Sequence, residues 1–151
     1  MRVLLIQPWS SSELMDRVYL FEPLALEYLG AGARLDGHEV KILDARIDRD
    51  TAGAIRSFRP DVVGLTGFTS HLNIIRELAA QAKGIDPEIT VIVGGHHATV
   101  SPDDFNDPAV DFVVIGEGVA TLRELLAVVA GRMDLRQVRG VAVPFPGGLL
   151  L

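Results

Sequence analysis

The chain contains no cysteine among its 151 residues. Disulfides, iron–sulfur clusters and cysteine-ligated zinc sites are therefore excluded within it. A chain without cysteine fits the reducing environment of the cytoplasm, and we expect that location. Any cofactor chemistry that needs cysteine ligands must come from outside this chain.

Basic stripes and long apolar runs are also scarce. The sequence has 14 lysine and arginine residues against 20 acidic ones, which gives a net charge of −6. No stretch forms the basic surface that binds nucleic acid, so we expect no nucleic-acid partner. The apolar runs, such as residues 125–130, fall far short of the roughly 18 residues of a membrane span, and we expect no membrane partner.

Several common catalytic motifs are missing as well. The first apolar run ends in Gln7 without a following G-x-G-x-x-G loop, which argues against a dinucleotide site. The sequence also lacks the P-loop, the G-x-S-x-G elbow and the H-E-x-x-H zinc motif. We therefore predict no catalytic residue and no protein metal ligand within this chain.

Five short apolar runs alternate with longer segments of helical periodicity. Such alternation predicts βαβ units, and nearly unbroken valine- and isoleucine-rich runs are typical of strands buried in a parallel sheet. We assign the α/β flavodoxin-like (Rossmann-like) class, a three-layer αβα sandwich with a five-stranded parallel sheet in the order 2-1-3-4-5. The predicted strands are residues 3–6, 40–43, 62–65, 89–93 and 112–115.

The predicted helices follow the strands. The first contains Gly30 and Gly32 within one turn, for which either close packing on the sheet or a ligand slot is a sufficient reason. Residues 7–22 precede it as a long loop, which is either functional or a surface insertion. The predicted helices are residues 24–35, 51–58, 72–83 and 121–131, with a further helix start at residues 101–104.

Ligands of open parallel sheets bind beyond the carboxyl ends of the strands. The residues that follow the predicted strands are therefore candidate cofactor-binding residues. Glycines there let a ligand approach the backbone, hydroxyls offer hydrogen bonds, and N–H groups at a helix start suit a phosphate. The candidates are Pro8, Trp9, Thr66, Gly67, Phe68, Thr69, Ser70, Gly94, Gly95, His96, His97, Gly116, Glu117 and Gly118.

Structural explanations compete at several of these positions. Thr69 or Ser70 can cap a helix, and the two glycines after the fourth strand can form a tight turn. His96 and His97 are adjacent, so in most backbone conformations they point in different directions. We expect a polar contact from them rather than a metal site.

In series, these segments resemble the cobalamin-binding domain at the N-terminus of cobalamin-dependent radical SAM enzymes of the methyltransferase type. The matching pieces occur in the order of that family and cover about residues 1–130. The sequence departs from the family at Ala25, where glycine is common, and at Val119, where glutamate often follows instead. The matching pieces are residues 22–29, 37–45, 60–66, 93–99 and 111–118.

The resemblance implies bound cobalamin. The D-x-H-x-x-G motif is missing from the first loop, so the resemblance implies base-off cobalamin with no protein histidine on cobalt. The nucleotide tail would enter a slot beside Gly94, Gly95 and the first helix, and Trp9 is a candidate cover for the lower cobalt face. The resemblance also implies S-adenosylmethionine and a [4Fe-4S] cluster bound outside this chain, in a radical SAM catalytic domain of the same parent chain.

We place the cobalamin-binding domain at residues 1–134 and the start of a linker to the following domain at residues 135–151, within which residues 138–143 are a candidate strand. The implied reaction is methyl transfer, although some relatives catalyse ring closure or rearrangement. Two alternatives remain. One is a stand-alone cobalamin carrier or sensor, and the other is a flavodoxin-like FMN or nucleotide module that uses residues 10–12 as a phosphate loop.

Overall fold

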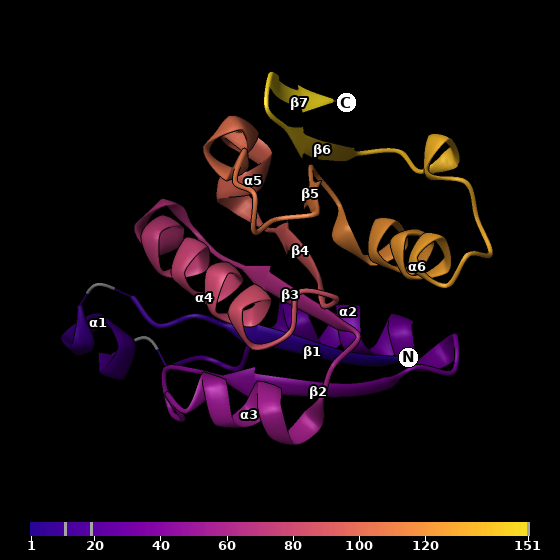
Figure 1. Cartoon of the computed structure of the whole chain (residues 1–151). Helices are drawn as coiled ribbons and strands as arrows, with labels where there is room; N and C mark the ends of the chain where they lie inside the picture. The colour runs from indigo at the N-terminus through magenta and orange to yellow at the C-terminus, as the bar shows by residue number, and fades with distance from the viewer. Residues whose placement is uncertain (11, 19, 151) are drawn as a thin grey trace.

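The computed structural model describes residues 1–10, 12–18 and 20–150. One sheet runs through the molecule in the order β2-β1-β3-β4-β5-β6-β7 (Figure 1). The strands from β1 to β5 are parallel, and β6 and β7 run antiparallel to their neighbours. The strands are β1 (Arg2–Gln7), β2 (Glu39–Asp44), β3 (Val62–Thr66), β4 (Thr90–Gly94), β5 (Phe112–Val114), β6 (Val141–Phe145) and β7 (Gly148–Leu150).

Helices cover both faces of this sheet. Side chains of α2 and α6 share one hydrophobic cluster, and side chains of α3, α4 and α5 share another. The α-helices are α1 (Glu13–Val18), α2 (Leu24–Leu35), α3 (Thr51–Phe58), α4 (Leu72–Ile85), α5 (His96–Val100) and α6 (Gly118–Val129). Short 3-10 helices are η1 (Thr69–His71), η2 (Pro102–Phe105) and η3 (Leu135–Gln137).

The side chains of β1 divide between the two clusters. Leu4 and Ile6 belong to the cluster of α3, α4 and α5, whereas Val3 and Leu5 belong to the cluster of α2 and α6. This alternation follows from the two-residue period of a strand. All four side chains are at most 1% exposed, so β1 is a central strand buried on both faces, as its unbroken apolar sequence predicts.

The predicted three-layer α/β class and the order 2-1-3-4-5 of the first five strands are confirmed. The prediction of a five-stranded sheet is wrong, because the sheet has seven strands. After α6 the chain returns antiparallel, and Val141 and Ala142 of β6 pair with Val114 and Val113 of β5. This return needs no crossover helix, so the strand–helix alternation gave no sign of it.

The segment predicted as a linker contributes to this extension. Residues 141–145 and 148–150 form β6 and β7, and Ala142 is fully buried against the cluster of α3, α4 and α5. The boundary at residue 134 and the following domain stay predictions. Within the described part of the chain, no helix combines the length and apolar character needed to cross a membrane.

Two helical segments differ from the predictions. The predicted helix start at residues 101–104 is the 3-10 helix η2, and the preceding α-helix α5 was not predicted. The long first loop contains α1, a helix of six residues. Both unpredicted helices are too short to display a clear apolar period, which explains why the sequence did not reveal them.

Candidate functional site

A cavity of about 600 Å³ opens at the carboxyl edge of the sheet, between α2, α6 and the strand ends. Its volume lies in the range of pockets for drug-sized ligands. Its location agrees with the rule that open parallel sheets bind ligands beyond the carboxyl ends of their strands. Of the predicted site residues, those that line it are Thr66, Gly94, Gly95, His96, Gly116, Glu117 and Gly118.

The floor of the cavity is a row of residues that crosses three neighbouring strands. Leu5 pairs with Gly64, and Gly64 pairs with Ile92. A Cβ atom on Gly64 would lie 2.7 Å from Cδ2 of Leu5, closer than real side chains approach. The Leu5 side chain therefore occupies the space beside Gly64 that a larger residue would need, and the floor is closely packed at this point.

The walls of the cavity come from the helices. Leu26 and Leu29 of α2 lie on one side, and Gly118 and Leu122 of α6 lie on the other. A Cβ atom on Gly118 would lie 3.3 Å from Cδ2 of Leu29, so a side chain there would press on the facing helix. Glycine at the first residue of α6 thus keeps the mouth of the cavity open.

The rim contains two glycines with left-handed backbone conformation. Gly95 has a φ of +96° and Gly116 a φ of +86°, conformations that favour glycine. A Cβ atom on Gly95 would also lie 2.5 Å from Oγ1 of Thr66. Thr99 connects the two loops, because its hydroxyl donates to the carbonyl of Gly95 and accepts from the backbone N–H of Gly116, each at 3.0 Å.

The two adjacent histidines point to different places, as the sequence predicts. His96 is exposed and lines the cavity, and its ring centroid lies 5.9 Å from that of Phe68. His97 is buried on the other side of the loop. Its Nδ1 lies 3.0 Å from the hydroxyl of Thr69 and its Nε2 lies 3.0 Å from a carboxylate oxygen of Asp104.

The carboxylate fixes the role of one ring nitrogen of His97. Because a carboxylate only accepts hydrogen bonds, Nε2 donates to Asp104, while Nδ1 pairs with the Thr69 hydroxyl. The backbone N–H of His97 also donates to the carbonyl of Gly67. His97 therefore connects the loops that follow β3 and β4, and its role in the described structure is to hold them together.

The comparisons with known proteins bear on this cavity. The family model of the B12 binding domain matches residues 15–126, about three quarters of the chain. This chain belongs to the B12-binding domain family. The expected cofactor class, cobalamin, is confirmed at the level of that family.

Relatives and a solved structure agree with the family. An uncharacterised methyltransferase of Pyrococcus horikoshii is 34% identical over 94% of this chain and 32% of its own length. The cobalamin-dependent radical SAM methyltransferase TokK of Streptomyces tokunonensis is 31% identical over 74% of this chain and 16% of its own length. This B12-binding domain thus spans a third or less of these relatives.

The fold of this chain also matches a solved structure. The radical S-adenosylmethionine methyltransferase TsrM of Kitasatospora setae, solved with cobalamin and a [4Fe-4S] cluster, superposes with a TM-score of 0.81. The match covers 99% of this chain and 30% of TsrM at 21% sequence identity. At that identity the match shows only that this chain and the matching part of TsrM share a fold.

The predicted residues after β3 lie beside the cavity rather than in it. Phe68, Thr69 and Ser70 are exposed at the carboxyl edge, and none of them lines the cavity. Gly67 is buried, and a Cβ atom there would lie 2.8 Å from Cβ of His71. His71 accepts the backbone N–H of Phe68 at Nδ1, and burial lowers the pKa of its imidazole, while nearby Asp16 opposes that shift.

The predicted residues after β1 also lie away from the cavity. Pro8 is buried, and Trp9 packs against the cluster of α3, α4 and α5 with the Arg49 guanidinium 5.2 Å from its ring centroid. Covering the lower cobalt face stays a prediction for Trp9. Ser11, the middle residue of the alternative phosphate loop, lies outside the described residues.

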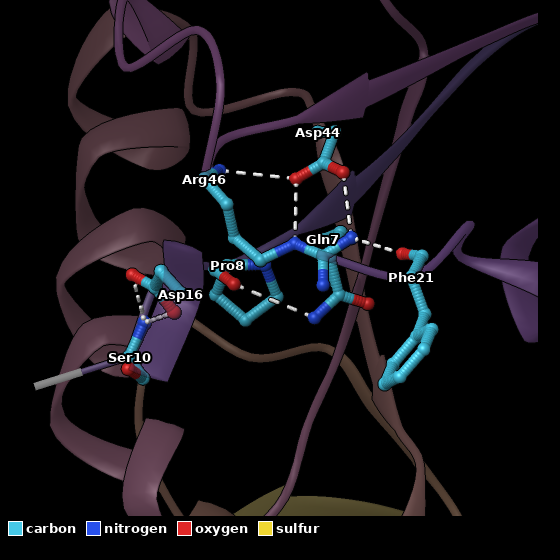
Figure 2. Close-up of polar contacts among 7 residues, drawn as sticks. All are labelled: Gln7, Pro8, Ser10, Asp16, Phe21, Asp44 and Arg46. Carbon is cyan, nitrogen blue, oxygen red and sulfur yellow. Dashed lines mark hydrogen bonds and ion pairs between the residues drawn. The ribbon is translucent and has the colours of Figure 1, made fainter. Parts of the chain in front are cut away.

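A polar cluster that was not predicted from the sequence organises this first loop (Figure 2). The Arg46 guanidinium forms two hydrogen bonds with Asp44, at 2.9 and 2.7 Å, and donates to the carbonyl of Phe21 at 2.6 Å. Both carboxylate oxygens of Asp16 accept the backbone N–H of Ser10 at 3.0 Å. The loop before α2 is thereby held to the end of β2. The helix α2 that follows this loop forms one wall of the cavity.

The two glycines of α2 have a packing role. A Cβ atom on Gly30 would lie 3.3 Å from Val40 of β2, and one on Gly32 would lie 3.2 Å from Arg123 of α6. Neither residue lines the cavity. Close contact with the sheet and with α6 is therefore the reason for these glycines, and the slot lies toward the N-terminal half of α2.

Proposed function

We propose that this B12-binding domain takes the nucleotide arm of cobalamin into the cavity and holds the corrin ring across the carboxyl edge of the sheet. The observation that carries the proposal is the cavity of about 600 Å³ between α2, α6 and the strand ends. A cavity of this size suits one arm of the cofactor rather than the whole corrinoid. The glycines at the mouth allow the arm to pass between α2 and α6.

The residues around the mouth fit the polar parts of such an arm. Glu117 precedes α6 without a side-chain cap, so the first N–H groups of α6 are free to meet a phosphate. The Thr66 hydroxyl and the Glu117 carboxylate line the same mouth and can bind hydroxyl or amide groups. We assign the corrin amides to the exposed side chains of Thr69 and Ser70, which lie at this edge.

We further propose that the cofactor is held base-off, because its nucleotide arm lies in the cavity, and that no histidine of this chain binds cobalt. The chain has four histidines. The ring nitrogens of His97 are both engaged, His71 is buried and accepts a backbone N–H, and His38 precedes β2 at the opposite edge of the sheet. His96 is the exposed histidine at the cavity, and it is the residue that a test must address.

Bound cobalamin supplies a cobalt centre that can receive and release a methyl group. We propose that it serves a radical SAM methyltransferase, whose S-adenosylmethionine and [4Fe-4S] cluster lie in a separate domain of the parent chain. The absence of cysteine from this chain requires a cluster held elsewhere. A stand-alone carrier or sensor and an FMN module are the competing functions, and neither has an observation in its favour.

Retention of cofactor tests the proposal. The purified chain is mixed with hydroxocobalamin and, separately, with FMN, and each mixture is passed through a desalting column. We expect retained cobalamin with a base-off absorption spectrum, and the same spectrum for the His96→Ala variant. Retention of FMN alone would defeat the proposal. A spectrum that depends on His96 would defeat the part that places no histidine on cobalt, and a base-on spectrum would defeat the base-off part.

A further inference from the structure

We infer that the cavity floor selects corrinoids whose nucleotide carries an apolar base, such as dimethylbenzimidazole, over corrinoids that carry adenine. The inference rests on the proposed function, because it concerns which nucleotide arm the cavity admits. It goes further by assigning a specificity to the chain's own residues.

Burial sorts the cavity lining into two sets. The lining side chains that are at most 5% exposed are all apolar, namely Leu5, Leu26, Leu65, Ile92, Val114 and Leu122. The polar lining side chains are more open, with Thr66 half-buried and His96, Thr99 and Glu117 exposed. A group that reaches the floor therefore leaves the polar side chains behind at the rim.

The backbone of the floor offers no partners either. Leu5, Gly64 and Ile92 lie in β1, β3 and β4, each of which has a strand on both sides. All three residues take part in the ladders between these strands. Their N–H and C=O groups are committed within the sheet, so a ligand at the floor finds carbon atoms only.

The two bases differ in what they bring to such a floor. Both contain an imidazole ring, but dimethylbenzimidazole fuses it to a methylated benzene ring. Adenine fuses it to a ring with two nitrogens and an exocyclic amine, which lose their water on entering the floor and gain no partner. Buried polar groups without partners cost enough to weaken binding by roughly tenfold to hundredfold.

The apolar lining also favours the methylated base. Removal of apolar surface from water stabilises binding, and the methyl groups contribute such surface against the buried apolar side chains of the cavity. Both effects act in the same direction. They depend on the floor and not on the corrin ring, which is identical in the two cofactors.

The test compares ligands on the unaltered chain. Equilibrium binding is measured for hydroxocobalamin, for its counterpart with an adenine base, and for cobinamide, which lacks the nucleotide arm. We expect cobalamin to bind roughly tenfold to hundredfold more tightly than the adenine form. Equal affinity of the two bases, or equal affinity of cobinamide and cobalamin, would overturn the inference while leaving corrinoid binding intact. Failure to bind any corrinoid would defeat the proposed function itself.

A pair of matched variants locates the effect. Val114→Thr places a hydroxyl in the buried lining of the cavity without changing the shape of the side chain. We expect it to reduce the preference for the dimethylbenzimidazole form over the adenine form severalfold. Val138→Thr is the control, because Val138 is buried in the same cluster but does not line the cavity. An unchanged preference in Val114→Thr, or an equal change in the control, would contradict the assignment to the floor.

Discussion

The hydroxyl of Thr99 accepts the backbone N–H of Gly116 at 3.0 Å and joins two loops that flank the cavity. The same hydroxyl donates to the carbonyl of Gly95, so one exposed side chain satisfies a group in each loop. Thr99 itself lines the cavity. The spacing of the two glycine loops thus depends on a residue that contributes little to the hydrophobic core.

Replacement of Thr99 tests this dependence. Thr99→Val keeps the shape and removes both hydrogen bonds, each worth about 1 kcal/mol. We expect cobalamin to dissociate about tenfold faster, and the melting temperature of the free protein to fall by several degrees, because both bonds are already formed there. Thr99→Ser keeps the hydroxyl and is expected to restore retention. Equal loss in both variants would show that the methyl group, and not the hydroxyl, is responsible.

Gly64→Ala is expected to fill the floor. The added Cβ atom would lie 2.7 Å from Cδ2 of Leu5, the flexible end of a side chain that can shift toward the cavity. We expect a loss of cobalamin affinity of tenfold or more, with a change in unfolding free energy within about 1 kcal/mol. Gly84→Ala in α4 is the control, since its Cβ atom meets nothing within 4 Å. Unchanged cobalamin affinity in Gly64→Ala would contradict the placement of the nucleotide arm against Leu5 and Gly64.

His38 is expected to make the fold sensitive to acid. It is 7% exposed, neither ring nitrogen has a hydrogen-bond partner, and burial lowers its pKa from 6.5, with the N-terminal ammonium and Arg132 adding to the effect and Asp36 opposing it. Below pH 6.5 the unfolded chain binds a proton that the folded chain does not, so stability falls as pH decreases.

The measurement is urea unfolding as a function of pH. His38 contributes a slope of at most about 1.4 kcal/mol per pH unit, and buried His71 adds a contribution of the same sign. His38→Phe removes the first contribution and leaves the second. We expect a shallower slope in this variant, and an identical slope would mean that His38 does not titrate with unfolding.

Arg46→Lys is expected to loosen the first loop. Lysine cannot reproduce the paired hydrogen bonds to Asp44 together with the one to the carbonyl of Phe21. The Arg46 side chain is 11% exposed, so we expect a loss of about 1–3 kcal/mol in unfolding free energy. Arg136→Lys is the control, because the Arg136 side chain is 91% exposed and its ion pair with Asp134 is a surface pair. Equal unfolding free energies of the two variants would argue that Arg46 does not stabilise the first loop.

The central sheet and the edge that carries the site were predictable from local sequence. An unbroken apolar run such as β1 predicts a buried strand, and a glycine directly after a strand predicts a ligand-binding loop, from a few neighbouring residues alone. The candidate strand at residues 138–143 overlaps β6, although Pro144 hid its C-terminal part. The pairing of Val114 with Val141 joins residues far apart in the sequence, so the place of β6 in the sheet and the added strand β7 escaped prediction.

The cavity floor escaped prediction for a different reason. Gly64 lies inside a strand, where glycine marks a close approach of a ligand or backbone, but the face on which it lies depends on the register with Leu5 and Ile92. Sequence reasoning found the rim at Gly95 and Gly116 because these glycines stand in loops. It did not show which of His96 and His97 lines the cavity, since that depends on packing.

The division of the core by the sheet has a consequence for mutational tolerance. The layer of α3, α4 and α5 packs against its face of the sheet, whereas the layer of α2 and α6 encloses the cavity. In a library of variants selected only for soluble expression, residues of the layer of α3, α4 and α5 should therefore vary little, and residues of the layer of α2 and α6 should vary more. A library selected for cofactor binding should reverse that pattern. Comparison of the two libraries would then separate the positions that stabilise the fold from the positions that bind the cofactor.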